Sequence, residues 1–155
     1  MTKSTKYYYL CPVKSQHLKE IRAFNRFYTN IIGLLDKHIL NSNYSLPEVR
    51  IMFELYHHTE LTASYVISVL DIDKGYLSRI LRGFEKNKLI IKVISSSDKR
   101  SASLKLTTKG KKEFEVLNAE SDRQVKKTFE SLTENECNEL VQKMMEIRQI
   151  LNRKK

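Results

Sequence analysis

Apolar residues recur at helical spacing near both ends of the chain and predict long amphipathic helices there. Over Leu18–Leu40 they return every three or four positions, so one face of a single helix carries them all. The polar stretch Asn41–Asn43 ends this helix. A second long helix is predicted over Thr108–Phe129. A third is predicted over Thr133–Leu151, where Thr133 and Glu136 form a capping box.

Three shorter helices are predicted between these regions, because each apolar stretch follows a residue suited to cap a helix. Ser45 begins the first, with Glu48 as its capping-box partner and Pro47 in the first turn. Thr62 caps the second helix and Asp73 caps the third. The side chains expected to face the core are Val49, Met52, Phe53 and Tyr56 on the first helix and Leu77, Ile80, Leu81 and Phe84 on the third, and the second helix contains the apolar residues Tyr65, Val66, Val69 and Leu70.

Two β-branched stretches, Leu89–Ser95 and Ala102–Thr107, are predicted to form a hairpin around the polar connector Ser96–Ser101. Two short helices followed by a hairpin describe a winged helix-turn-helix. We therefore predict a mainly α-helical fold with a small β-hairpin wing, of the α+β winged-helix class. Its regions in one compact domain are an arm over residues 1–17, a helical dimerisation region over residues 18–44 and 108–155, and a winged helix-turn-helix DNA-binding region over residues 45–107.

The chain carries a net charge of +10, and almost all of this excess lies in one quarter of the sequence. Between Asp73 and Lys112 there are 12 Lys and Arg residues against 3 acidic residues. Solubility alone does not require cations to be gathered in one region. The clustering therefore indicates a polyanionic partner such as duplex DNA.

The helix that begins after Asp73 is predicted to read DNA. If its apolar side faces the core, the opposite side presents cations, a glycine and a hydroxyl but no acid, whereas a solvated helix usually alternates its charges. Arginines suit base edges, and lysines and hydroxyls suit phosphates. A solvated basic face is the alternative. The DNA-binding residues expected on this helix are Lys74, Gly75, Tyr76, Ser78, Arg79 and Arg82, of which Arg79 and Arg82 would contact bases and Lys74 and Ser78 phosphates.

The hairpin connector is the second predicted DNA contact, through Asp98, Lys99, Arg100 and Ser101. Arginine is favoured in narrow minor grooves, which is the place expected for Arg100. Asp98 is expected to pair with Arg100 and orient its guanidinium, because a free carboxylate would be repelled by DNA. Lys99 is expected to hold a phosphate. A flexible polar loop without a ligand is the alternative.

No pattern in the sequence indicates an enzyme, a cofactor or a metal site. The chain has no phosphate-binding glycine loop or nucleophile elbow. Cys11 and Cys137 give no disulfide framework, and oxidation sensing by Cys11 stays an alternative. His57 and His58 are adjacent and point to different sides of a helix, so they are poorly placed to chelate one ion. No apolar run is long enough to cross a bilayer, so a cytoplasmic, nucleoid-associated protein with no membrane contact is expected.

Three stretches resemble the MarR family of bacterial transcription regulators. They are Asp71–Lys92 (DIDKGYLSRILRGFEKNKLIIK), the wing residues Asp98 and Arg100, and the strand-to-helix motif LTxKG at Leu106–Gly110. The resemblance runs over about Leu18–Leu151. It implies a dimer built from the first and last helices and a ligand pocket between the dimerisation and DNA-binding parts. Some relatives carry an acetyltransferase domain after this module, which is not expected in a chain of this length.

One residue departs from the family pattern at the turn between the DNA-reading helix and the hairpin. Lys88 stands where the family usually has glycine. We expect Asn87 to take the left-handed conformation at this turn instead, because asparagine tolerates it better than most residues.

The sequence thus predicts a homodimeric, sequence-specific, double-stranded DNA-binding transcription regulator that recognises a pseudo-palindromic operator. A repressor released by a small-molecule effector is the form expected. An architectural or replication-type winged-helix protein without ligand switching is one alternative, and a winged-helix protein–protein interaction module is another.

Overall fold

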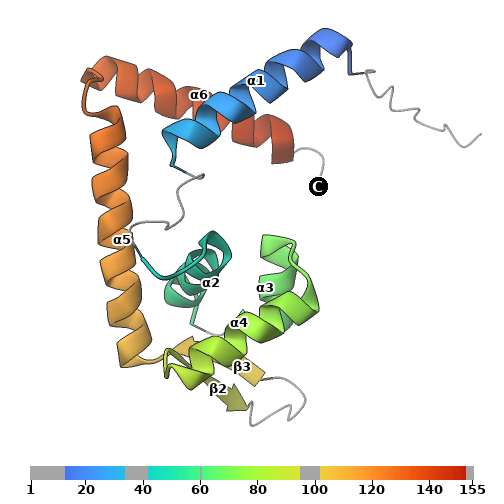
Figure 1. Cartoon of the computed structure of the whole chain (residues 1–155), viewed down its shortest axis with the longest axis vertical. Coiled ribbons are helices and arrows are strands. Elements are labelled where there is room, and N and C mark those ends of the chain that lie inside the picture. The colour runs from blue at the N-terminus through green and yellow to red at the C-terminus, as the bar shows by residue number, and fades with distance from the viewer. Residues whose placement is uncertain (1–12, 34–41, 60, 95–101, 153–155) are drawn as a thin grey trace, which may run out of the picture. The chain divides into compact units, whose positions relative to one another are not determined.

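The computed structural model describes residues 13–33, 42–59, 61–94 and 102–152. The chain divides into two units, residues 1–36 and residues 37–155. The elements of the second unit follow the predicted order, with one additional short strand (Figure 1). Among the described residues, no helix is long and apolar enough to cross a membrane.

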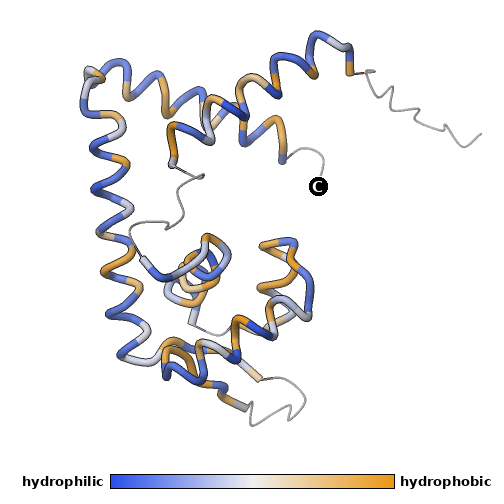
Figure 2. Tube along the Cα trace, viewed as in Figure 1, coloured by the Kyte–Doolittle hydropathy of each residue, from blue (hydrophilic) through white to orange (hydrophobic). Residues whose placement is uncertain are grey.

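The first unit contains one described helix, α1, over Ser15–Ile31. Its end falls earlier than the predicted Leu40. Gly33 follows the helix with a φ of 64°, a left-handed conformation that glycine adopts without steric cost. Residues 34–41 lie outside the described part of the chain. Orange and blue segments alternate along α1, as expected for an amphipathic helix (Figure 2).

The three short helices of the second unit begin at the predicted caps. They are α2 (Leu46–His57), α3 (Ala63–Leu70) and α4 (Lys74–Lys86). At α2, the Ser45 N–H donates to Glu48 Oε2 at 2.8 Å. At α3, the Tyr65 N–H donates to Thr62 Oγ1 at 3.2 Å, and at α4 the Tyr76 N–H donates to Asp73 Oδ1 at 2.9 Å. These bonds satisfy amides that the first turn of a helix leaves without partners.

The sheet has three antiparallel strands in the order β1-β3-β2. Strands β2 (Ile90–Ile94) and β3 (Ala102–Leu106) form the predicted hairpin, with Ile90 opposite Leu106. Strand β1 was not predicted from the sequence; it is only Leu61–Thr62 and pairs with the other edge of β3. Two residues are too few to show an alternating pattern, so β1 is defined by its partner.

The core lies between the three short helices, the sheet and the start of α5. All four predicted core residues of α4 are buried. The prediction for α2 was wrong in part, because Phe53 and Tyr56 are 42% and 39% exposed while Ile51 and Leu55 are buried. The buried side of α2 faces the sheet, whereas Phe53 and Tyr56 face α5 and contact the ring of Phe114. On α3 only Val66 is fully buried, and Tyr65 and Val69 are exposed.

Two long helices, α5 (Thr108–Phe129) and α6 (Glu134–Asn152), complete the second unit. The predicted capping box starts α6, since the Thr133 N–H donates to Glu136 Oε2 at 2.8 Å and the Glu136 N–H donates to Thr133 Oγ1 at 3.3 Å. Helix α6 has no buried residue. Its exposed apolar side chains are Val141, Met145, Ile147, Ile150 and Leu151.

Candidate nucleic-acid interface

Helix α4 has one buried face and one basic face. The buried side chains of α4 are at most 7% exposed, which fixes the rotation of the helix about its axis. The opposite face is solvent-exposed and contains Lys74, Gly75, Ser78, Arg79, Arg82 and Lys86. The structure therefore brings five of the six residues predicted for DNA contact onto one exposed face. The sixth, Tyr76, is half-buried and packs against the core.

Tyr76 also contacts one of the two arginines of this face. The guanidinium carbon of Arg79 lies 5.6 Å from the centre of the Tyr76 ring. A cation over an aromatic face is attracted by the ring quadrupole, so this contact favours one orientation of Arg79. The Arg82 Nε donates to the Ser78 carbonyl at 3.4 Å, a long hydrogen bond that leaves the guanidinium exposed.

The first turn of α4 combines a positive helix end with little steric bulk. Its amides carry the partial positive charge of the helix dipole, which Asp73 partly offsets by capping. Gly75 has no side chain, and a Cβ atom there would lie 3.0 Å from Asp73 Oδ1. A larger residue at this position would crowd the cap. Lys74 stands beside it as an exposed cation.

The last turn of α4 ends in a left-handed residue, but this residue is Lys88 and not the expected Asn87. Lys88 has a φ of 59° and Asn87 a φ of −84°. The Lys88 N–H donates to the Glu85 carbonyl at 2.9 Å, and the Leu89 N–H donates to the Phe84 carbonyl at 2.8 Å. This pattern is the Schellman motif, whose geometry requires the left-handed residue one position after the C-cap. The hydrogen bonds therefore override the preference of asparagine.

The LTxKG motif joins the end of α4 to the start of α5. Thr107 Oγ1 donates to the Lys88 carbonyl at 2.7 Å and accepts from the Gly110 N–H at 3.0 Å. Lys109 Nζ donates to the Asn87 carbonyl at 3.0 Å. A single turn thus caps α5 and satisfies carbonyls at the end of α4. The hydrogen bonds at this junction account for the threonine and the lysine of the motif, and Lys109 therefore has a structural role.

Another cation of the basic region is also used within the fold. Lys92 on β2 forms an ion pair with Glu85 of α4, with 2.8 Å between Nζ and Oε1. The predicted wing residues Asp98, Lys99, Arg100 and Ser101 lie outside the described residues, as does the expected Asp98–Arg100 pair.

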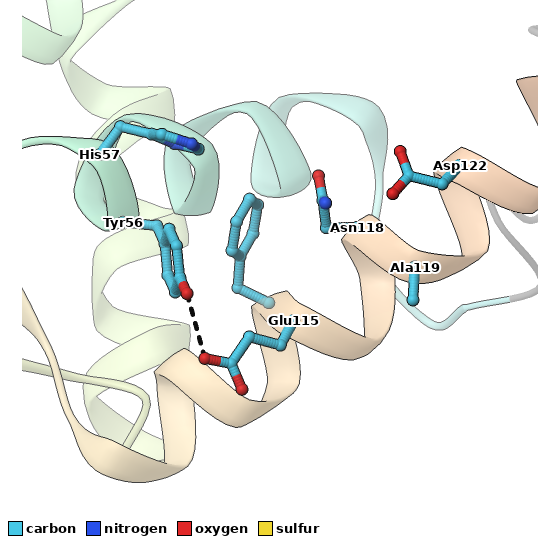
Figure 3. Close-up of a pocket in the computed structure, with 7 residues that line it drawn as sticks. Tyr56, His57, Glu115, Asn118, Ala119 and Asp122 are labelled. Atoms are coloured by element: carbon cyan, nitrogen blue, oxygen red, sulfur yellow. Dashed lines mark hydrogen bonds between the residues drawn. The ribbon is translucent and has the colours of Figure 1, made fainter.

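A hollow of about 160 Å³ between α2 and α5 was not anticipated from the sequence (Figure 3). Its lining residues are Tyr56, His57, Phe114, Glu115, Asn118, Ala119 and Asp122. The Tyr56 hydroxyl donates to Glu115 Oε1 at 3.1 Å, and this hydrogen bond, with the charge of Glu115, raises the pKa of Tyr56. The polar residues of α5 recur here at helical spacing, which is the signal that sequence reasoning overlooked.

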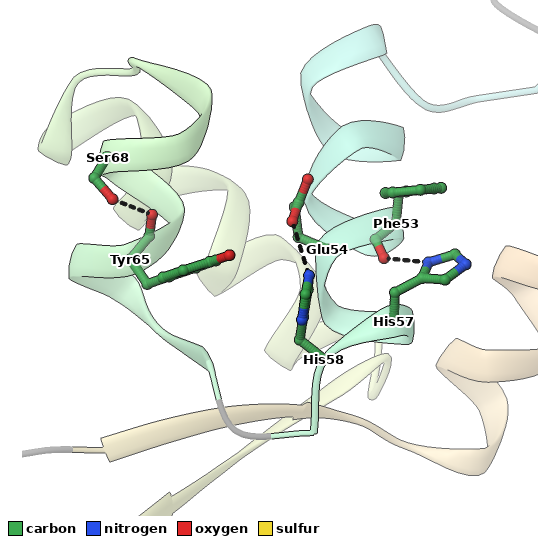
Figure 4. A network of polar contacts seen from close by, with 6 residues as sticks. All are labelled: Phe53, Glu54, His57, His58, Tyr65 and Ser68. Carbon is green, nitrogen blue, oxygen red and sulfur yellow. Dashed lines mark hydrogen bonds and ion pairs between the residues drawn. The ribbon is translucent and has the colours of Figure 1, made fainter. Parts of the chain in front are cut away.

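The end of α2 carries a small polar network (Figure 4). His58 Nε2 lies 3.6 Å from Oε2 of Glu54, a carboxylate-bearing residue that is only 7% exposed. His57 Nδ1 lies 2.9 Å from the Phe53 carbonyl oxygen. The two histidines therefore point to different sides of α2, as their adjacency predicts. Within the described ranges, no group of His, Cys, Asp and Glu side chains is arranged to hold a metal ion.

Comparisons with known proteins relate the chain to one family. A family model described as the MarR family matches residues 44–102. No curated protein matches the chain. The chain is similar to a solved MarR family protein from Bacillus stearothermophilus, at 16% identity and a TM-score of 0.76 over 90% of this chain and 98% of the other.

Two further solved structures share the fold. FabT of Streptococcus pneumoniae, solved in complex with DNA, matches with 20% identity and a TM-score of 0.74 over 90% of this chain and 99% of that protein. MepR of Staphylococcus aureus, a transcription regulator of a multidrug efflux pump, matches with 20% identity and a TM-score of 0.69 over 84% of this chain and 97% of that protein. The fold of the chain is therefore the winged-helix fold of these regulators.

Proposed function

Residues 44–102 of this chain are a MarR-family region, and on that premise we propose that the protein is a homodimeric regulator of transcription that binds double-stranded DNA. The observation that carries the proposal is the exposed face of α4, which gathers Lys74, Arg79, Arg82 and Lys86, while the one acidic residue of this helix, Glu85, is half-buried and paired with Lys92. In winged-helix proteins the corresponding helix enters the major groove. FabT, which has the same fold, was solved with DNA bound.

The residues of α4 divide by chemistry into two roles. Arg79 and Arg82 can each form a bidentate contact with a guanine edge. Lys74 and Ser78 hold phosphates and set the register of the helix in the groove. The wing residues Lys99 and Arg100 extend the contact to a phosphate and to the adjacent minor groove.

Dimerisation is proposed through α1 and α6, because both helices carry large apolar side chains that their own unit leaves exposed. On α1, Phe24 and Phe27 are 49% and 60% exposed, and on α6, Ile150 and Leu151 are 60% and 65% exposed. Such surfaces mark interaction sites in monomers. A two-fold axis would place two α4 helices in successive major grooves, about 10 base pairs apart, on a pseudo-palindrome.

Selection of bound duplexes from a random library with the full chain tests this proposal. We expect a pseudo-palindromic sequence to be enriched. Replacing Arg79 with Ala is expected to cost about 1–3 kcal/mol on that sequence and to relax the preference at one position. Lys127 is an exposed cation of α5, and Lys127→Ala is the matched control. This variant is expected to change neither the affinity for that sequence nor the sequence preference. Binding without sequence preference would favour an architectural role, and salt-insensitive binding to proteins would favour an interaction module.

We further propose that DNA binding is switched by a small effector, which the hollow between α2 and α5 is placed to receive. Its residues lie on helices that also contact the DNA-reading part, since α2 packs on the sheet and α5 begins at the junction with α4. A compound that occupies the hollow and lowers affinity for the selected operator would support this switch.

A further inference from the structure

The hollow between α2 and α5 is lined by groups that accept hydrogen bonds. Glu115 and Asp122 contribute carboxylates, which are acceptors only. Tyr56 directs its hydroxyl hydrogen to Glu115, so this donor is already used. Asp122 and Asn118 have no hydrogen-bond or ion-pair partner within the part of the chain that the structure describes.

The remaining polar group of the hollow, His57, can accept a hydrogen bond when its ring is neutral. Its Nδ1 lies 2.9 Å from the Phe53 carbonyl oxygen (Figure 4). A carbonyl can only accept, so Nδ1 must carry the hydrogen of this bond. In the neutral imidazole, Nε2 then has a lone pair and no hydrogen. With the His57 ring neutral, the Asn118 amide is the one lining side chain with hydrogen-bond donors still to offer.

The charge of the lining is opposite to that of the chain. The protein has a net charge of +10, yet the hollow is lined by two carboxylates and by no lysine or arginine. An anionic ligand would meet two like charges there. A cation would be attracted by both, although solvent screens charges at an open site.

Two aromatic rings form the apolar part of the hollow. The Tyr56 and Phe114 rings have centroids 4.7 Å apart, and Phe114 is only 2% exposed, so the pair is held firmly by the core. Aromatic faces attract alkylammonium groups through the ring quadrupole and also bind apolar groups. The Tyr56 ring, which is 39% exposed and backed by the buried Phe114, is therefore the aromatic surface beside the carboxylates that suits a ligand both cationic and apolar.

From this lining we propose that the hollow binds small organic cations, namely amines or quaternary ammonium compounds with an aromatic or branched alkyl body. Its volume of about 160 Å³ restricts the bound part to roughly the size of one substituted ring. The assignment of such a compound as the effector rests on the proposed regulatory function. Binding of the cation to the hollow does not depend on that function, and it can be measured on the protein without DNA.

The test is titration of the full chain, without DNA, with benzyltrimethylammonium, benzyl alcohol and benzoate, followed by calorimetry and amide NMR. We expect affinity in the order cation, alcohol, anion, with NMR shifts centred on Tyr56 and Ala119. Glu115→Gln and Asp122→Asn are each expected to weaken cation binding about two- to fivefold, and about tenfold together. Glu139→Gln, an exposed carboxylate on α6, is the matched control and is expected to leave binding unchanged.

Tyr56→Phe separates the two parts of the site, because it keeps the ring and frees Glu115 from its hydrogen bond. We expect it to bind the cation at least as tightly as the natural chain. The proposal is overturned if benzoate binds as well as the cation, or if the double carboxylate variant keeps full cation affinity while remaining folded by circular dichroism. Operator binding is measured separately, so a failure of DNA binding would leave the result for the hollow intact.

Discussion

Gly110 lies against the backbone of Leu89 so closely that a Cβ atom at position 110 would sit 2.1 Å from the Leu89 carbonyl oxygen. This oxygen accepts the Thr107 N–H at 2.9 Å, so it cannot turn away without losing a hydrogen bond. The same added atom would also lie 3.1 Å from Leu106 Cδ2. Glycine at this position is thus required by backbone packing, while its backbone conformation is ordinary helix.

Gly110→Ala is therefore expected to destabilise the protein by about 1–3 kcal/mol, as overpacking does in a well-packed core. Gly83→Ala is the matched control, since Gly83 is also helical and an added Cβ would meet no atom within 4 Å. This control is expected to stabilise by about 0.5–1 kcal/mol through helix propensity. The free energies of unfolding of the two variants, measured in urea, test this expectation. Equal free energies would contradict the close approach of position 110 to the Leu89 carbonyl oxygen.

Lys88→Gly is expected to stabilise the protein by about 1 kcal/mol. A side chain in the left-handed region costs about 1–2 kcal/mol, and the greater freedom of glycine in the unfolded chain offsets part of the gain. Lys88→Ala separates this effect from the loss of charge, because alanine keeps a Cβ atom. Thermal and urea unfolding of both variants measure the difference. If alanine stabilised as much as glycine, the charge and not the backbone would be responsible.

The α6 cap predicts a specific pH dependence. The pKa of Glu136 is lowered because its carboxylate accepts hydrogen bonds from the Thr133 N–H and, next, from the Thr133 hydroxyl. The ionised form is thus favoured in the folded state. Its contribution to stability is fully present above the ordinary pKa of 4.5 and is lost as the pH falls through the lower folded-state pKa.

Glu136→Ala is accordingly expected to lower stability at neutral pH, with a deficit that shrinks as the solution is acidified below pH 4.5. Glu139→Ala, an exposed carboxylate of the same helix, is expected to show no such trend. Unfolding by urea across this pH range provides the comparison. A deficit for Glu136→Ala that is independent of pH would rule out the charged cap.

Tyr76 is expected to act on DNA recognition through Arg79. Tyr76→Phe keeps a ring beneath the guanidinium and is expected to preserve affinity, whereas Tyr76→Leu keeps apolar packing but removes the ring. An exposed cation–ring contact contributes about 0.5–1 kcal/mol, so Tyr76→Leu is expected to weaken operator binding about two- to fivefold. Affinity for unrelated duplexes is the internal control. Equal weakening on all sequences would show that Tyr76 supports folding or phosphate contact instead.

The sequence predicted best those features that depend on neighbouring residues. The caps at Ser45, Thr62, Asp73 and Thr133 are local hydrogen bonds, and all four helices begin where these residues predict. The two faces of α4 were also predicted correctly, because one side of that helix is packed and the other side is exposed to solvent.

The features that the sequence did not predict depend on distant parts of the chain. Helix α2 is contacted on two sides, so its apolar residues exceed one face, and periodicity alone did not show which of them face the sheet. Lys88 adopts the left-handed conformation because hydrogen bonds to Phe84 and Glu85 require it there. The hollow beside Tyr56 exists only once α2 and α5 are brought together.

The hydrogen bonds between Thr107, Lys109 and the last carbonyls of α4 have a mechanical consequence. They tie the start of α5 to the end of α4 through two side chains, the Thr107 hydroxyl and the Lys109 ammonium, which hold the carbonyls of Lys88 and Asn87. Glu115 and Asp122 lie further along the same rigid helix. The two helices are therefore coupled at this junction, and a displacement of α5 near Asp122 is expected to be passed on to the helix proposed to read bases.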